Sequence, residues 1–297
     1  MDYMIDIPNV DRDERIGSAF DHLMRVIQQT EAHEGRVIWN LSNISILHPF
    51  FLVPLAIYKQ RHKDIIKFAN IPSRIASYLE LIHFNEPLSI DKGTGMLESY
   101  ISKSYLPICR FDLHKSDADS LQGILQRIIL EQSKAAHSLI TPLSYFFSEL
   151  ICNMTQHSRG NYGYVFSQYL RKEDCINLVL ADDGITVYSS YVRTKKYLDE
   201  IKGNEANALR IAYEGKSTKG LPYAENRGFG LSSSEKMLVE GLHGLFFMLS
   251  GGAFHRHDRV DSVFIDLPED IYWEGTIILM RIPTNPPTGF DYSNYTQ

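Results

Sequence analysis

One stretch decides how the chain is interpreted: Tyr145-Phe-Phe-Ser-Glu-Leu-Ile-Cys-Asn-Met-Thr-Gln-His157. Its apolar residues recur at helical spacing and predict a helix over 142–157 that packs one stripe against a core. Three polar residues, Glu149, Asn153 and His157, are spaced by four and therefore form a separate column on that helix. Because the column lies roughly a quarter turn from the apolar stripe, we expect it at the shoulder of the buried face.

The column combines a carboxylate, an amide and an imidazole. Such a set can hold Mg²⁺, phosphate oxygens and an attacking water together, because Mg²⁺ prefers oxygen ligands and keeps several waters. The solvated shoulder of an ordinary amphipathic helix gives the same spacing, and short motifs often match by chance. The column alone therefore does not distinguish a site from a surface.

A second feature is an apolar strand that ends in two carboxylates, Leu178-Val-Leu-Ala-Asp-Asp-Gly-Ile-Thr186. Asp182 is an acceptor for an exocyclic amino group such as that of adenine. Gly184 allows the backbone to approach a flat ligand closely. A strand followed by a common Asp-Gly turn is the simpler alternative.

The third feature is glycine-rich and comprises Gly215-Lys-Ser-Thr-Lys-Gly220 and Arg227-Gly-Phe-Gly-Leu-Ser-Ser-Ser-Glu-Lys236. Glycines directly before a helix leave backbone N–H groups available to phosphate oxygens, and the helix dipole favours the negative charge. The pattern is neither a Walker A loop nor a dinucleotide GxGxxG. A flexible loop before an ordinary helix is the alternative.

Taken in order, the three features resemble the GHKL superfamily, which includes gyrase, the large heat-shock chaperone, mismatch-repair ATPases and sensor histidine kinases. Glu149-x-x-x-Asn153 is similar to its N box and Asp182-x-Gly184 to its first glycine box. The resemblance covers about 105–283, and the ordered set is specific although no single box is.

The rest of the resemblance lies nearer the carboxyl end. Gly228-x-Gly230-Leu231 is similar to the second glycine box, and Thr276 is similar to the threonine of the closing strand, which lies near the adenine aspartate. The resemblance implies an α+β two-layer sandwich, the Bergerat fold, in which helices cover one face of a mixed sheet.

The resemblance also implies roles for the matched positions. Asn153 would coordinate Mg²⁺, and Asp182 would bind the adenine amino group. Glu149 stands where the hydrolysing branches place the general base, but histidine kinases use this position differently, so binding is implied more directly than hydrolysis. With Glu149 as the catalytic residue, the implied ATP-binding residues are Asn153, His157, Asp182, Gly184, Ser217, Thr218, Lys219, Gly228, Gly230, Leu231 and Thr276.

One position departs from the family pattern. Thr186 stands where the first glycine box usually has its second glycine. This substitution could tighten the loop or alter nucleotide exchange, and it keeps open a degenerate scaffold that no longer uses nucleotide.

The amino-terminal part, 1–90, alternates strand and helix patterns and predicts an α/β unit with a mostly parallel sheet. The stretch Arg36–Ser45 and the helix after His48 resemble a STAS-like domain. In bacterial anti-sigma systems a GHKL kinase phosphorylates a serine at the start of that helix, but the sequence here is His48-Pro49-Phe50. We expect 91–104 to be a linker and 105–297 to be the ATP-binding domain.

Composition restricts the class of protein. The chain has 297 residues, 44% of them hydrophobic, and a net charge of −6, which gives no general attraction to nucleic acid or an anionic membrane. Three scattered cysteines and a start without a secretory signal favour the cytoplasm. The expected partners are ATP and an unidentified protein, and a homodimer is left open.

The sequence therefore predicts a cytoplasmic ATP- and Mg²⁺-binding regulator, a slow ATPase that switches a protein interaction. The first alternative is a protein serine/threonine kinase of the anti-sigma type, and the second is a non-hydrolysing scaffold. His255 and His257 alternate before Asp258, but zinc needs three or four ligands, so we expect a solvated hairpin there.

Overall fold

The computed structural model describes residues 2–10, 17–45, 48–90, 94–115, 118–135, 137–218 and 230–295. Over these residues the chain is a mixed α/β protein. It divides into two compact units, Met1–Leu88 with Pro107–Cys109 and Ser89–Leu106 with Arg110–Gln297. Residues 94–100, which lie in the expected linker, form a 3-10 helix in the second unit.

The first unit contains a parallel three-stranded sheet in the order β1-β2-β3. Each strand is followed by a helix, as the alternating sequence pattern predicts. The bounds are β1 Tyr3–Asp6, α1 Gly17–Glu31, β2 Val37–Asn40, α2 Pro49–Arg61, β3 Ile66–Ala69 and α3 Ser73–Leu81.

Helix α2 is the apolar element of this unit. The side chains from Phe50 to Tyr58 are all buried, because this stretch is hydrophobic on every face. Helix α1 packs against α2, and the Trp39 indole of β2 donates a hydrogen bond to the Thr30 hydroxyl of α1 at 3.0 Å. The apolar run is therefore a core helix.

The other sheet has eight strands in the order β10-β9-β8-β11-β7-β6-β5-β4, most of which belong to the second unit. The strands β6, β7, β11, β8, β9 and β10 are neighbours in that order, and all five of these pairings are antiparallel. The bounds are β4 Leu88–Ser89, β5 Tyr105–Asp112, β6 Tyr162–Leu170, β7 Cys175–Asp182, β8 Leu245–Gly251, β9 Ala253–His257, β10 Ser262–Asp266 and β11 Trp273–Pro283.

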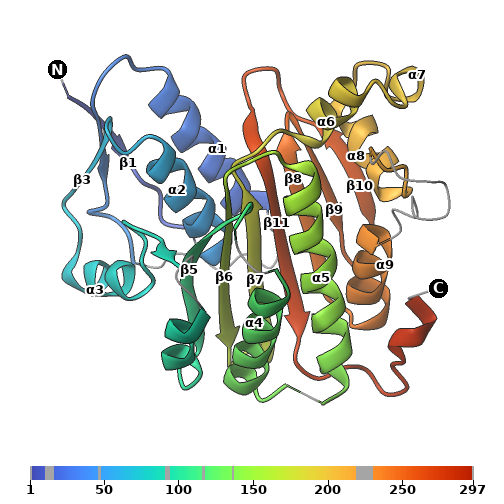
Figure 1. Cartoon of the computed structure of the whole chain (residues 1–297). Helices are drawn as coiled ribbons and strands as arrows, with labels where there is room; N and C mark the ends of the chain where they lie inside the picture. The colour runs from blue at the N-terminus through green and yellow to red at the C-terminus, as the bar shows by residue number, and fades with distance from the viewer. Residues whose placement is uncertain are drawn as a thin grey trace. The chain divides into compact units, whose positions relative to one another are not determined.

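Helices α4, α5 and α9 lie on one face of this sheet (Figure 1). Helix α5 extends from Ile140 to His157, and its apolar stripe is buried as the helical spacing predicts. The other helical segments are η1 Thr94–Tyr100, α4 Ala118–Ser133, η2 His137–Leu139, α6 Val187–Thr194, α7 Leu198–Ile201, α8 Glu205–Tyr213, α9 Gly230–Lys236, the π-helix η3 Met237–Gly241 and η4 Tyr292–Tyr295.

Two elements differ from the sequence prediction. The helix expected after the glycine-rich stretch begins at Gly230 and becomes a π-helix after Lys236. Strand β9 was not predicted as a strand of the sheet, and the solvated hairpin expected around His255 is wrong for that residue, which is 2% exposed. Within the described ranges no helix has the length and apolar character needed to span a bilayer.

Candidate functional site

Helix α5 presents the predicted polar column beside its buried stripe. Glu149, Asn153 and His157 are half-buried, whereas Leu150 and Met154 next to them are buried. The shoulder position that the spacing predicts is therefore the one that these side chains occupy.

Strand β7 ends at Asp182, whose side chain is only 3% exposed. In the sheet Asp182 pairs with Thr276 of β11 on one side and with Gly163 of β6 on the other. Its Oδ1 accepts a hydrogen bond of 2.9 Å from the Gly184 amide, which holds the carboxylate at the start of the turn.

The neighbouring Asp183 has a structural role. Its Oδ1 accepts hydrogen bonds of 2.8 Å from the backbone N–H groups of Asn161 and Tyr162 and so ties the turn to the start of β6. The two adjacent aspartates are thus distinguished by environment, and only Asp182 reaches the cavity described below.

A serine hydroxyl links three elements around Thr276. Ser250 Oγ of β8 donates to the Gly275 carbonyl at 3.0 Å, lies 3.1 Å from the Thr276 hydroxyl, and accepts from the Val187 amide at 3.0 Å. The first turn of α6 is therefore fixed to the sheet next to the Asp182–Thr276 pair. Ser250 is not among the predicted site residues, because the sequence around it indicates only the end of a strand.

The segment after α8 is held by hydrogen bonds from two other helices. The Thr218 hydroxyl lies 2.9 Å from His157 Nδ1 of α5 and 3.1 Å from Ser190 Oγ of α6. The Tyr191 hydroxyl donates to the Lys216 carbonyl. Burial, and next the nearby Tyr197, raises the pKa of the Tyr191 phenol, which keeps this donor protonated.

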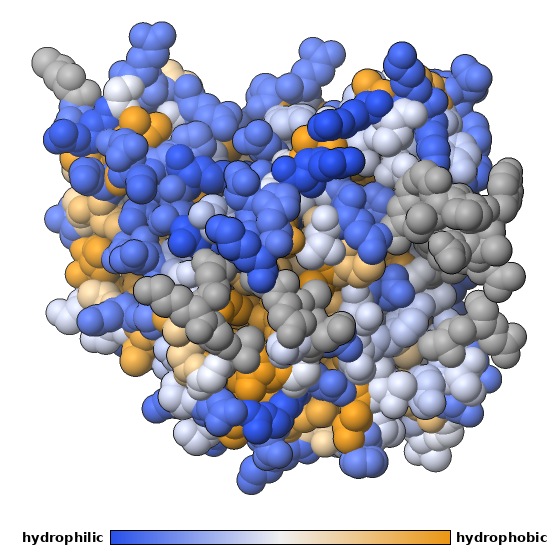
Figure 2. All heavy atoms as spheres, viewed as in Figure 1, coloured by the Kyte–Doolittle hydropathy of each residue, from blue (hydrophilic) through white to orange (hydrophobic). Residues whose placement is uncertain are grey.

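Acidic side chains lie close to Lys216 in this segment. Figure 2 shows mostly hydrophilic side chains over α6 and α7, with a few hydrophobic ones between them. The Lys216 ammonium forms ion pairs with Glu200 and with Glu214, the latter at 3.4 Å. The positive charge of Lys216 is therefore already partly neutralised by acidic neighbours.

These elements enclose one cavity, with about 800 Å³ of empty space including some open solvent. By surface area its lining is mainly apolar, although about half of the lining residues have polar side chains. The lining residues are Leu150, Asn153, Met154, His157, Ser158, Asp182, Ile185, Thr186, Val187, Ser190, Tyr191, Ala212, Gly215, Lys216, Ser217, Thr218, Leu231, Met248, Thr276 and Ile278.

The cavity gathers most, but not all, of the predicted site residues. Those that line it are Asn153, His157, Asp182, Ser217, Thr218, Leu231 and Thr276. Lys219 and Gly228 lie outside the described residues.

Glu149, Gly184 and Gly230 are described but do not line the cavity. A methyl group on Gly184 would overlap the Ser158 carbonyl, so this glycine permits the turn to pack on the end of α5. A methyl group on Gly230 would overlap the Glu149 carboxylate. Both glycines therefore make room for protein atoms.

Sequence reasoning missed several lining residues. Ser190, Met248 and Ile278 occupy ordinary helix and strand positions, and no local signal indicates that they face a cavity. Thr186 has a local explanation, because its hydroxyl accepts from the Ser189 amide at 3.0 Å and caps α6.

For a metal ion, the polar lining offers the Asn153 amide and the Asp182 carboxylate as oxygen ligands. Across the described part of the chain there is no cluster of three or more His, Cys, Asp or Glu side chains with a geometry suited to a metal. A metal at this cavity would therefore be held by few protein groups together with a ligand, which is how Mg²⁺ is usually bound.

Comparison of the chain with family models, with curated proteins and with solved structures gave no match.

Proposed function

We propose that the second unit binds ATP with Mg²⁺ in this cavity, as a GHKL-type domain with a Bergerat-like arrangement. The observation that carries the proposal is that Asn153 on α5, Asp182 on β7 and Thr276 on β11 line one cavity. Their order along the chain is that of the family motifs, and an ordinary amphipathic helix and an ordinary Asp-Gly turn give no reason for such convergence.

The Asp182 side of the cavity suits an adenine ring. A buried carboxylate accepts hydrogen bonds and therefore favours a ligand with an amino group. The Thr276 hydroxyl lies beside it, and Met248 and Ile278 supply apolar surface for a flat ring.

The polar side of the cavity suits phosphates and a cation. Asn153, His157, Ser190 and Thr218 offer amide, imidazole and hydroxyl groups to phosphate oxygens. The Asn153 amide oxygen would hold Mg²⁺, which supplies the positive charge that the paired Lys216 provides only in part.

We further propose that nucleotide occupancy regulates a protein interaction. Thr218 forms hydrogen bonds with α5 and α6, and a bound triphosphate would replace or strengthen them. Its presence would therefore shift the conformational equilibrium of residues 214–218, which follow α8. The first unit, with its alternating strands and helices, would be a STAS-like module through which a partner senses the change.

Calorimetry with Mg²⁺-ATP tests the proposal. Wild type should bind, Asp182→Ala and Asn153→Ala should each lose about tenfold or more in affinity, and the exposed Asp199→Ala should match wild type. Binding that survives both site substitutions would discredit this cavity as the site.

A turnover assay with labelled ATP separates the possible reactions. Glu149→Ala should retain ATP and lose phosphate release if this carboxylate activates water. Label transferred to a partner protein would instead indicate a kinase, and binding without turnover would indicate a scaffold.

A further inference from the structure

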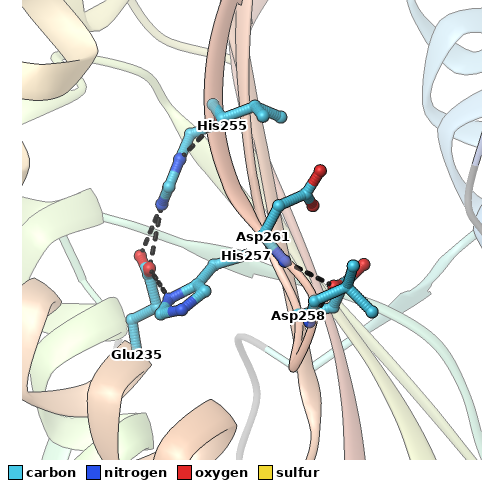
Figure 3. A network of polar contacts seen from close by, with 7 residues as sticks. Glu235, His255, His257, Asp258 and Asp261 are labelled. Atoms are coloured by element: carbon cyan, nitrogen blue, oxygen red, sulfur yellow. Dashed lines mark hydrogen bonds and ion pairs between the residues drawn. The ribbon is translucent and has the colours of Figure 1, made fainter.

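A buried carboxylate lies on α9, outside the proposed nucleotide cavity. Glu235 is 0% exposed, and its two oxygens both lie 2.9 Å from Nε2 of His255. Its Oε1 also lies 2.5 Å from Nδ1 of His257. Figure 3 shows both imidazoles, which come from the same face of β9, directed at this one carboxylate.

Hydrogen-bond chemistry determines how many protons this cluster holds. His255 Nδ1 lies 2.9 Å from the Val263 carbonyl, and because a carbonyl only accepts, Nδ1 must carry a proton. At 2.9 Å from both carboxylate oxygens, a bare lone pair on Nε2 would be repelled. A second proton therefore lies between His255 and Glu235, and a third lies between His257 and Glu235.

The surroundings keep these protons in place. The Tyr213 hydroxyl of α8 donates to Glu235, and the His255 ring stacks on Phe264 of β10 at 3.9 Å. Hydrogen bonding to Glu235 raises the pKa of His257, although burial opposes it.

Other charged groups also face the cluster. Glu240 of η3 and Asp258, just after β9, add negative charge near His257. On the far side, the Arg210 guanidinium of α8 lies over the Phe264 ring at 5.4 Å. Arg256, which lies between the two histidines on β9, pairs with Asp258 and Asp261, while Glu240 and Asp258 help to raise the pKa of His257.

The cluster connects elements that also line the cavity. Helix α9 carries Glu235 and contributes Leu231 to the cavity lining. Helix α8 carries Tyr213 and contributes Ala212, and Gly215 just after this helix also lines the cavity. Directly after α9 the backbone forms the π-helix η3, a rare geometry often found at functional sites. A change in the cluster would therefore move two walls of the cavity relative to the sheet.

We propose that Glu235 is a positioning residue for the nucleotide site: its hydrogen bonds with His255 and His257 hold α8 and α9 on the β9–β10 hairpin, and nucleotide affinity falls as rising pH removes the positive charge of His257. This inference rests on the proposed function, because the affinity concerned is that for Mg²⁺-ATP.

The test is calorimetry of the full chain with Mg²⁺ and a non-hydrolysable ATP analogue, from about pH 6 to about pH 9. Wild type is compared with Glu235→Gln, His257→Gln and a control, His114→Gln, which alters an exposed histidine outside the cavity and the cluster. The ligand and His157 also titrate, so the ratio of wild-type to variant affinity is taken at each pH.

We expect wild type to bind roughly tenfold more tightly than Glu235→Gln and His257→Gln at about pH 6, with the ratio approaching one at about pH 9. The His114→Gln ratio should stay near one throughout. A merely structural role would lower affinity by the same factor at every pH. Circular dichroism identifies a variant that fails to fold, and His257, at a partly exposed position, provides a second variant if Glu235→Gln does not.

Two outcomes overturn the inference and differ from failure of the proposed function. If wild type binds the analogue and the ratios of wild-type to variant affinity do not depend on pH, Glu235 does not position the nucleotide site, but the proposed site itself stands. Nitrogen NMR of the nucleotide-free chain that finds His257 neutral at about pH 6 removes the charge on which the pH dependence rests. Wild type that binds no nucleotide at any pH removes the proposed function and this inference with it.

Discussion

Asn153 on α5 and Asp182 at the end of β7 line the same cavity. The first is half-buried and the second almost wholly buried, so one has access to solvent-borne ions while the other sits in a desolvated environment. In the proposed complex this difference would place the charged phosphates and their cation on the Asn153 side and the uncharged ring on the Asp182 side.

In the proposed complex, Asp182 would determine which base is preferred. Adenine offers an amino group where guanine has a carbonyl, and a carboxylate attracts the first and repels the second. We expect ATP to bind about 100-fold more tightly than GTP, with Asp182→Asn reducing this preference to about tenfold or less. Competition between the two nucleotides in a fluorescence assay measures the ratio. A wild-type chain that binds both equally would contradict the role of Asp182.

Gly230 makes a second prediction possible, because a methyl group there would overlap the Glu149 carboxylate. Gly230→Ala should therefore displace Glu149 and, if Glu149 is the base, lower turnover by about 100-fold with a smaller effect on binding. Phosphate release and calorimetry on the same samples separate the two effects.

The matched control for Gly230 is Gly123 on α4. It is exposed in a helix interior, and a methyl group there would meet no atom within 4 Å. Gly123→Ala should leave turnover unchanged and raise stability by about 0.5–1 kcal/mol, because alanine loses less backbone entropy in a helix. Equal turnover in Gly230→Ala and Gly123→Ala would show that displacement of Glu149 does not matter.

Much of the second unit could be predicted from local patterns. Strands β5 and β6, 105–112 and 162–170, are apolar runs between polar turns, a pattern that is typical of a buried strand. Strand β9 was missed because Ala253–His257 contains two histidines and an arginine. His255 is buried there only because Glu235, on another element, supplies its partner.

The candidate site shows the same limit. Asn153 and Asp182 could be predicted because each stands out against an apolar pattern that fixes its position on a helix or a strand. Ser250 and Ser190 could not, since their roles depend on tertiary contacts with Val187 and Thr218. Glu235 looks like an exposed helix residue in sequence and is completely buried in the structure.

The capping role of Thr186 predicts an order of stability among three variants at this position. Its hydroxyl caps α6, and its side chain is 2% exposed. Thr186→Ala should cost about 1 kcal/mol, Thr186→Gly only a few tenths, and Thr186→Ser less than Thr186→Ala, because glycine and serine are accepted at N-caps. Urea unfolding followed by circular dichroism gives the order. If alanine were tolerated better than glycine, capping would not explain why threonine replaces the usual glycine.

His257 gives the pH dependence of stability. The pKa of His257 in the folded chain is raised above 6.5, chiefly by the hydrogen bond to Glu235. The contribution of His257 to the free energy of unfolding is therefore complete at a pH below its unfolded pKa, and it is lost as pH rises through its folded pKa. Wild type should exceed His257→Gln in free energy of unfolding by about 1–2 kcal/mol near pH 6, and the gap should narrow as pH rises toward about 9. Urea unfolding without nucleotide measures the gap, and His114→Gln should show none. A gap that widens with pH would mean that His257 is neutral in the folded chain and that Glu235 holds its protons elsewhere.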